Sequence, residues 1–121
     1  MKVIVFVAVL ASTAAADPLK VATLGDFNYA DTRIHTFERA ELKKLAQEWR
    51  ANKSWATITV EGHGYYRDNE EASIELGQQR ADHARALLIQ YGVDPHMVVA
   101  VGHAEAKAER DVDVIVQAYK R

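Results

Sequence analysis

Apolar residues alternate with polar ones in two segments of the chain. Between Trp55 and Glu61, Ile58 and Val60 share one face and threonines share the other, and a similar alternation recurs over residues 112–117. Successive side chains of a strand point to opposite faces, so one face of each segment can be buried while the other meets solvent. Both segments are therefore predicted to be half-buried strands.

Two other parts of the chain also favour strands, although apolar and polar residues do not alternate clearly in them. Residues 21–24 and 27–30 are short and β-prone, and the glycine-aspartate pair between them is typical of a bulge or bend. Residues 98–101 form a continuous apolar run, and we expect either Val99 or Val101 to face the core. These segments supply the first and third of four predicted strands.

Apolar spacings of three and four residues predict a helix in the first half of the chain. It begins near Thr36, a residue type suited to the N-cap, and ends at residues 52–54. Its apolar stripe comprises Leu42, Leu45, Ala46 and Trp49.

A second helix is predicted from about Ser73 or Ile74 to Tyr91. Gly92 is its natural stop, because glycine readily adopts the left-handed conformation that ends helices. The polar segment 65–73 before it is predicted to be a loop. The apolar stripe of this helix comprises Leu76, Ala81, Ala84, Leu87 and Leu88.

The predicted order of elements is β-α-β-α-β-β. Strands that alternate with helices favour parallel neighbours joined by right-handed crossovers, which places both helices on one face of the sheet. The loop before the last strand is too short for a crossover, so that strand should run antiparallel to its partner. The fold class is α/β, an α+β two-layer sandwich, and 121 residues suit one domain.

Composition and charge exclude several functions. The formal net charge is -2 and the basic residues are scattered, so we expect no nucleic-acid partner. Without cysteine there is no disulfide, no thiolate nucleophile and no site for a lipid anchor. The sequence holds no Gly-x-Ser-x-Gly or His-Glu-x-x-His motif, so we expect neither an enzyme nor a cofactor.

The first 16 residues have the three parts of a signal peptide. A charged start at Lys2 precedes an apolar run over residues 3–11, and three alanines end at Ala16. The run is well short of the roughly 20 apolar residues that a spanning helix needs. We predict cleavage after Ala16, a mature domain of residues 17–121 with no transmembrane segment, and export to the periplasm, where the domain is either free or associated with the outer membrane.

Five segments, in order, are similar to motifs of the OmpA-like C-terminal domain family, which includes the Pal-like peptidoglycan-binding domains. Any one of these motifs is weak, but the ordered set covers nearly the whole mature chain. The segments are Phe27-Asn28-Tyr29 with Asp31 and Ile34, Leu42 to Trp49, Ile58 to His63, Leu76 to Ala81, and Tyr91-Gly92-Val93.

The resemblance implies a mixed sheet in the order 1-4-2-3, with strand 4 antiparallel. It also implies non-covalent binding of the peptidoglycan stem peptide at its diaminopimelate residue. In the family, a carboxylate after the Gly-His-x segment faces the diaminopimelate ammonium, and the Arg of the Arg-Ala signature pairs with its carboxylate. Charge-assisted hydrogen bonds of this kind suit an amino-acid head group.

When the family site is mapped onto this chain, some residues match the family's motif and others differ from it. Arg80 matches the ligand-binding Arg, whereas Tyr65 stands where the family has Asp and Ser73 where an Asn is usual. Asp68, in the same loop, could restore the lost carboxylate. Near its C-terminal end the family often has two successive arginines, where this chain has Arg110-Asp111. The predicted ligand-binding residues are His63, Gly64, Tyr65, Asp68, Ser73, Arg80 and Arg110.

Four alternatives remain open at this stage. Arg80 could be a solvated helix arginine, and Ser73 could be only a helix N-cap. His63 and His103 each follow a glycine where a strand is expected to stop, so they could be neighbours that bind a metal with Glu105 or Asp68. The whole domain could also be an envelope adaptor that has lost its ligand and binds a protein partner.

Overall fold

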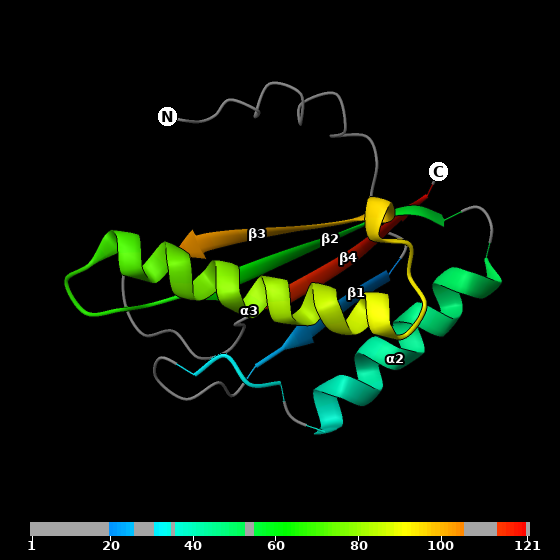
Figure 1. The fold of residues 1–121 in the computed structure, drawn as a ribbon, viewed down its shortest axis with the longest axis horizontal. Coiled ribbons are helices and arrows are strands. Elements are labelled where there is room, and N and C mark those ends of the chain that lie inside the picture. The colour runs from blue at the N-terminus through cyan, green and yellow to red at the C-terminus, as the bar shows by residue number, and fades with distance from the viewer. Residues whose placement is uncertain (1–19, 26–30, 35, 53–54, 106–113, 121) are drawn as a thin grey trace.

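Two helices cover one face of a four-stranded mixed sheet (Figure 1). The structure is a computed structural model that describes residues 20–25, 31–34, 36–52, 55–105 and 114–120. The predicted element order β-α-β-α-β-β is confirmed. The elements are β1 (Lys20–Leu24), α2 (Thr36–Ala51), β2 (Trp55–Gly64), α3 (Glu70–Gln90), the short 3-10 helix η1 (Pro95–Met97), β3 (Val98–Ala104) and β4 (Val114–Lys120).

The strands lie in the order β1-β4-β2-β3. β2 and β3 are parallel, and β4 runs antiparallel to both β1 and β2. Both the predicted order and the antiparallel last strand are therefore confirmed. Because β2 and β3 are parallel and in register, with Gly64 opposite Ala104, their carboxyl ends lie side by side at one edge of the sheet.

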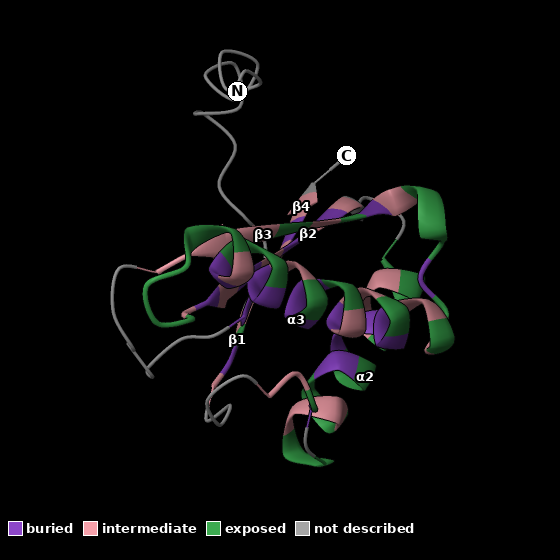
Figure 2. Cartoon of the chain, turned by 60° about the vertical axis from the view of Figure 1, so that its left-hand side comes forward, coloured by how far each residue is buried: buried purple, intermediate pink, exposed green. Residues whose placement is uncertain are grey.

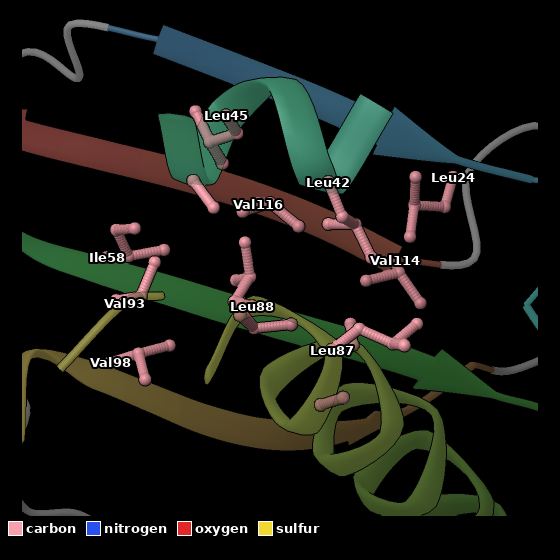
Figure 3. Close-up of a cluster of buried hydrophobic side chains, with 14 of the residues drawn as sticks. Leu24, Leu42, Leu45, Ile58, Leu87, Leu88, Val93, Val98, Val114 and Val116 are labelled. Carbon is pink, nitrogen blue, oxygen red and sulfur yellow. The ribbon is translucent and has the colours of Figure 1, made fainter. Parts of the chain in front are cut away.

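The core lies between the helices and the sheet, where side chains of both layers meet (Figure 3). Each helix is buried along one side and exposed along the other (Figure 2). Trp49 packs against this core but is only partly buried. The buried side chains include Leu42 and Leu45 of α2, Leu87 and Leu88 of α3, Ile58 and Val60 of β2, and Val114 and Val116 of β4.

The side chains of β3 face opposite ways from those expected. Val98 is 3% exposed, whereas Val99 and Val101 are 53% and 42% exposed, so the prediction of a core role for either was wrong. Helices cover one face of the sheet, and that face takes alternate residues beginning at Val98. A continuous apolar run does not show which alternate set is buried, because both sets are apolar.

Two predicted strand stops were also wrong, because β2 continues to Gly64 and β3 to Ala104. The glycines near these ends serve a different purpose. A Cβ atom on Gly62 would meet the backbone carbonyl of Gly77, and one on Gly77 would lie 2.7 Å from the carbonyl oxygen of His103. Glycines here let α3 approach the two strands closely, which places its first turns beside their ends.

Helix α3 begins earlier than the sequence indicated. Asn69 is the N-cap, and its side-chain oxygen accepts a hydrogen bond from the Ala72 backbone N–H at 2.9 Å. The loop predicted over residues 65–73 is therefore shorter, and the N-cap role considered for Ser73 was wrong. At the other end, Gly92 with a φ of 114° confirms the predicted stop.

No helix in the described part of the chain is long and apolar enough to cross a membrane. The predicted signal peptide, the β-prone piece at 27–30 and Arg110 lie outside the described residues.

Candidate functional site

The carboxyl ends of β2 and β3 and the start of α3 meet at one corner of the molecule. The backbone N–H of Glu105 donates to the carbonyl of Gly64 at 2.8 Å, which extends the pairing of the two strands beyond Ala104. The backbone is thus held in place at the points where β2 and β3 end. The segments that follow, Tyr65–Asn69 and Glu105, form part of one surface.

Ser73 holds the loop after β2 against the first turn of α3. Its side chain is buried at 2% exposure. The hydroxyl accepts a hydrogen bond from the Tyr66 backbone N–H at 2.7 Å and donates to the Asn69 carbonyl at 2.8 Å. Asp68, in the same loop, has a φ of 54°, a left-handed conformation that aspartate tolerates better than most residues. The Ser73 hydroxyl and the backbone turn at Asp68 therefore set the shape of the loop.

Arg80 is buried beneath this corner, with 2% exposure. Its Nε donates to the carbonyl of Asp31 at 2.8 Å and one Nη donates to the carbonyl of His63 at 2.7 Å. The interpretation of Arg80 as a solvated helix arginine was therefore wrong. The guanidinium joins the segment before α2 to the end of β2, a structural role that the sequence pattern did not reveal. Its role in ligand binding stays a prediction.

A surface hollow of about 400 Å³ opens between the loop and the end of β3. Three of its lining residues carry carboxylates, and none is lysine or arginine. Three of the predicted ligand-binding residues line it, namely Tyr65, Asp68 and Ser73. The lining residues are Tyr65, Tyr66, Asp68, Asn69, Glu70, Ser73, Ala104 and Glu105.

A second hollow of about 570 Å³ continues along the outer side of α3. It shares Tyr66 and Asn69 with the first, so the exposed Tyr66 ring stands at the boundary between them. Glu71 and Glu75 also line it, and the surface around the start of α3 is therefore acidic over both hollows.

His63 and His103 are neighbours on the sheet face that the helices leave open, as predicted. They occupy paired positions of β2 and β3, and their rings stack with centroids 5.1 Å apart. His63 Nδ1 lies 2.8 Å from Glu105 Oε2, and since a carboxylate only accepts, the imidazole N–H donates. His103 Nε2 lies 3.5 Å from Glu61 Oε1.

These groups do not form a metal centre. Among the described residues, no set of three or more histidine or acidic side chains is arranged to hold a metal ion. Sequence reasoning named Glu105 only as a metal ligand, and the structure instead places it in the wall of the first hollow. The signal that could have shown this was its place, one residue beyond a strand whose end lies beside that of β2.

Comparison with known proteins identifies relatives of the fold. The model of the OmpA family matches residues 27–120. The peptidoglycan-associated lipoprotein from Burkholderia pseudomallei is similar in structure, with a TM-score of 0.64 at 19% identity, covering 83% of this chain and 91% of that one. No curated protein matches the sequence significantly.

Two further solved structures share the architecture. The OmpA-like domain of FopA1 from Francisella tularensis has a TM-score of 0.65 at 11% identity, covering 80% of this chain and 71% of that one. The C-terminal domain of MotB from Helicobacter pylori has a TM-score of 0.64 at 20% identity, covering 80% and 83%. At such identities the structural likeness establishes the fold alone.

Proposed function

Because the chain belongs to the OmpA family, whose peptidoglycan-binding domains are not enzymes, we propose that it binds peptidoglycan non-covalently through the diaminopimelate residue of the stem peptide. The observation that supports this most is the first hollow. It lies where the family resemblance places the ligand, directly after the Gly-His-x segment, and its wall holds Tyr65, Asp68 and Ser73. We also propose that the protein acts in the periplasm after removal of residues 1–16.

The charge of the hollow suits an ammonium group. Asp68, Glu70 and Glu105 line it without a basic partner among the lining residues. A cationic ligand group would therefore gain charge-assisted hydrogen bonds, which are roughly twice as strong as neutral ones. The tyrosine rings of Tyr65 and Tyr66 add flat surface that can cover an aliphatic chain.

Arg80 is proposed to supply the positive charge for the ligand carboxylate. Its guanidinium is fixed at the end of β2 by the His63 carbonyl, next to the chain that leads into the hollow. Because Arg80 also connects Asp31 to β2, Arg80→Ala would remove a structural link together with any ligand contact. Variants of the exposed loop therefore test binding more cleanly than variants of Arg80.

Co-sedimentation of the purified chain with diaminopimelate-containing sacculi tests the proposal. We expect the chain to sediment, and free diaminopimelate to release it. Tyr65→Asp should strengthen binding by about 1.5–3 kcal/mol, because it adds the carboxylate that the family places opposite the ammonium. Tyr65→Asn is the matched control. Asparagine has nearly the same shape as aspartate but no charge, so this variant should not strengthen binding in this way.

An envelope adaptor is the second candidate, and Tyr65 favours it because tyrosine cannot supply the family's negative charge. In that case the domain would keep the fold and bind a protein partner. Failure of both the wild-type chain and Tyr65→Asp to sediment, while both remain folded, would reject the peptidoglycan proposal in favour of the adaptor.

Export has its own test. Mass spectrometry of a periplasmic extract should find a chain that begins at Asp17. A periplasmic chain that retains Met1 would show that the first 16 residues are not removed.

A further inference from the structure

We infer that Glu105 supplies the carboxylate that holds the ligand ammonium, in place of the residue at position 65. This inference rests on the proposed function and names the residue that would determine specificity within the same hollow. Three acidic side chains line that hollow, Asp68, Glu70 and Glu105. They differ in how firmly the structure holds them.

The position of Glu105 suits the role. The pairing of β2 with β3 ends at Gly64 and Ala104, and the hydrogen bond from Glu105 N–H to the Gly64 carbonyl continues it by one step. Positions 65 and 105 each directly follow the last paired residue of their strand, and neighbouring strands lie about 4.8 Å apart. A glutamate side chain is one methylene longer than an aspartate side chain. The Glu105 carboxylate can therefore reach from the neighbouring strand toward the place where the family's carboxylate at position 65 would lie.

Glu105 is also held in place at two points. Its backbone is tied to Gly64 and its Oε2 accepts a hydrogen bond from His63 Nδ1 at 2.8 Å, while its side chain is 32% exposed. A carboxylate has about four acceptor positions on its two oxygens, so this bond leaves acceptor capacity for a ligand N–H. A group held in its bound conformation loses little entropy on binding, which favours affinity.

Asp68 and Glu70 are less well prepared for the same task. Both are exposed residues, and Asp68 lies within the turn between β2 and α3. Ordering an exposed acidic side chain around a ligand costs conformational entropy, whereas the fold already fixes the conformation of Glu105. We therefore expect Asp68 and Glu70 to attract the ammonium at longer range and Glu105 to bind it.

The test is co-sedimentation with diaminopimelate-containing sacculi, using Glu105→Gln. Glutamine can still accept the hydrogen bond from His63 through its amide oxygen, so the substitution removes the charge and keeps the shape. Binding should weaken roughly ten- to a hundredfold, whereas Asp68→Asn should weaken it less. Adding Tyr65→Asp to Glu105→Gln should restore binding, because the charge returns one strand away.

Glu61→Gln is the matched control. Glu61 also lies beside a histidine, His103, at 3.5 Å, but it does not line the hollow, so this variant should bind as the wild type does. Wild-type binding with no loss in Glu105→Gln would overturn this inference and leave the proposed function intact. An equal loss in Glu61→Gln would also overturn it, because the effect would then come from the open face of the sheet. Failure of the wild type to sediment would overturn the proposed function itself.

Discussion

The two ends of α3 are held in place by different kinds of interaction. At its C-terminal end, Gly92 adopts a φ of 114°, and the Val93 N–H donates to the Leu88 carbonyl at 3.0 Å. The neighbouring Leu88 and Val93 side chains are buried in the core. At its N-terminal end, polar side chains cap the helix and tie down the loop beside an acidic hollow. One end is fixed by apolar packing and the other by hydrogen bonds at the surface.

This difference separates stability from function. The buried apolar side chains at the C-terminal end contribute hydrophobic free energy but no polar contact for a ligand. The polar end contributes less to stability and presents several charges to solvent around a hollow. Substitutions at the C-terminal end should therefore affect unfolding, and those at the N-terminal end should affect binding.

The largest effect on stability is expected for Leu88→Ala. Leu88 has no exposed surface, so truncation leaves a cavity and should lower the free energy of unfolding by about 2–5 kcal/mol. Ile74→Ala, near the other end of α3 where the side chain is 43% exposed, should cost only about 0.5 kcal/mol. Urea denaturation measures both, and equal losses would show that the two ends do not differ as described.

Gly77→Ala should come next, because Gly77 lies where α3 packs closely against β2 and β3. The added methyl would meet backbone carbonyls of Gly62 and His103, which cannot move as side chains do. Overpacking should cost about 1–3 kcal/mol even though alanine favours helices. Thermal unfolding beside the exposed control Gln79→Ala would test this, and an unchanged melting temperature would mean that the helix can shift without cost.

Asn69→Ala should lower the stability less than Gly77→Ala does, but it should change the shape of the first hollow more. Loss of the N-cap should cost about 0.5–2 kcal/mol, because the Ala72 N–H loses its acceptor. Asn69→Asp keeps an acceptor and should retain most of that stability. Hydrogen exchange of the first turn of α3 would report the change, and protection equal to that of the wild type would argue against a capping role.

The smallest effect concerns Asp94, just beyond the C-terminal end of α3. The hydrogen bond from the His96 backbone N–H holds the pKa of the Asp94 carboxyl below its ordinary value of 3.8. A lowered pKa in the folded state stabilises the fold at pH values above the unfolded pKa, and this contribution is lost as the pH falls through the folded pKa. Nuclear magnetic resonance titration should place the midpoint below 3.8. A midpoint at or above that value would contradict the hydrogen bond.

The contrast between the ends of α3 also explains what the sequence could reveal. The apolar stripes and Gly92 are local signals with one structural meaning, so both helices and the C-terminal stop followed from them, whereas the sheet order came from the family resemblance. Ser73 and Asn69 lie in a polar stretch, and polar composition alone does not distinguish a capped helix start from a loop. The open sheet face was missed for a related reason, since Val99 is as apolar as its buried neighbour Val98.

The candidate site was only partly readable from the sequence. Tyr65 and Ser73 were identified by motif and Asp68 by its place in the same loop, and the structure places all three in one hollow. Burial of Arg80 against the Asp31 and His63 carbonyls could not be foreseen, because it depends on where α3 crosses β2. Glu105 joins the hollow only through strand pairing, which places residues 40 positions apart side by side.

Titration of the labelled chain with a soluble stem peptide that ends in diaminopimelate, followed by nuclear magnetic resonance, tests peptidoglycan binding most directly. The account predicts saturable shifts of the backbone amides of Tyr65–Asn69 and Glu105, with Val99 on the open face unchanged. A peptide with lysine in place of diaminopimelate should bind more weakly, because it keeps the ammonium and lacks the second carboxylate. Shifts confined to the open face, or no shifts at saturating peptide, would contradict the account.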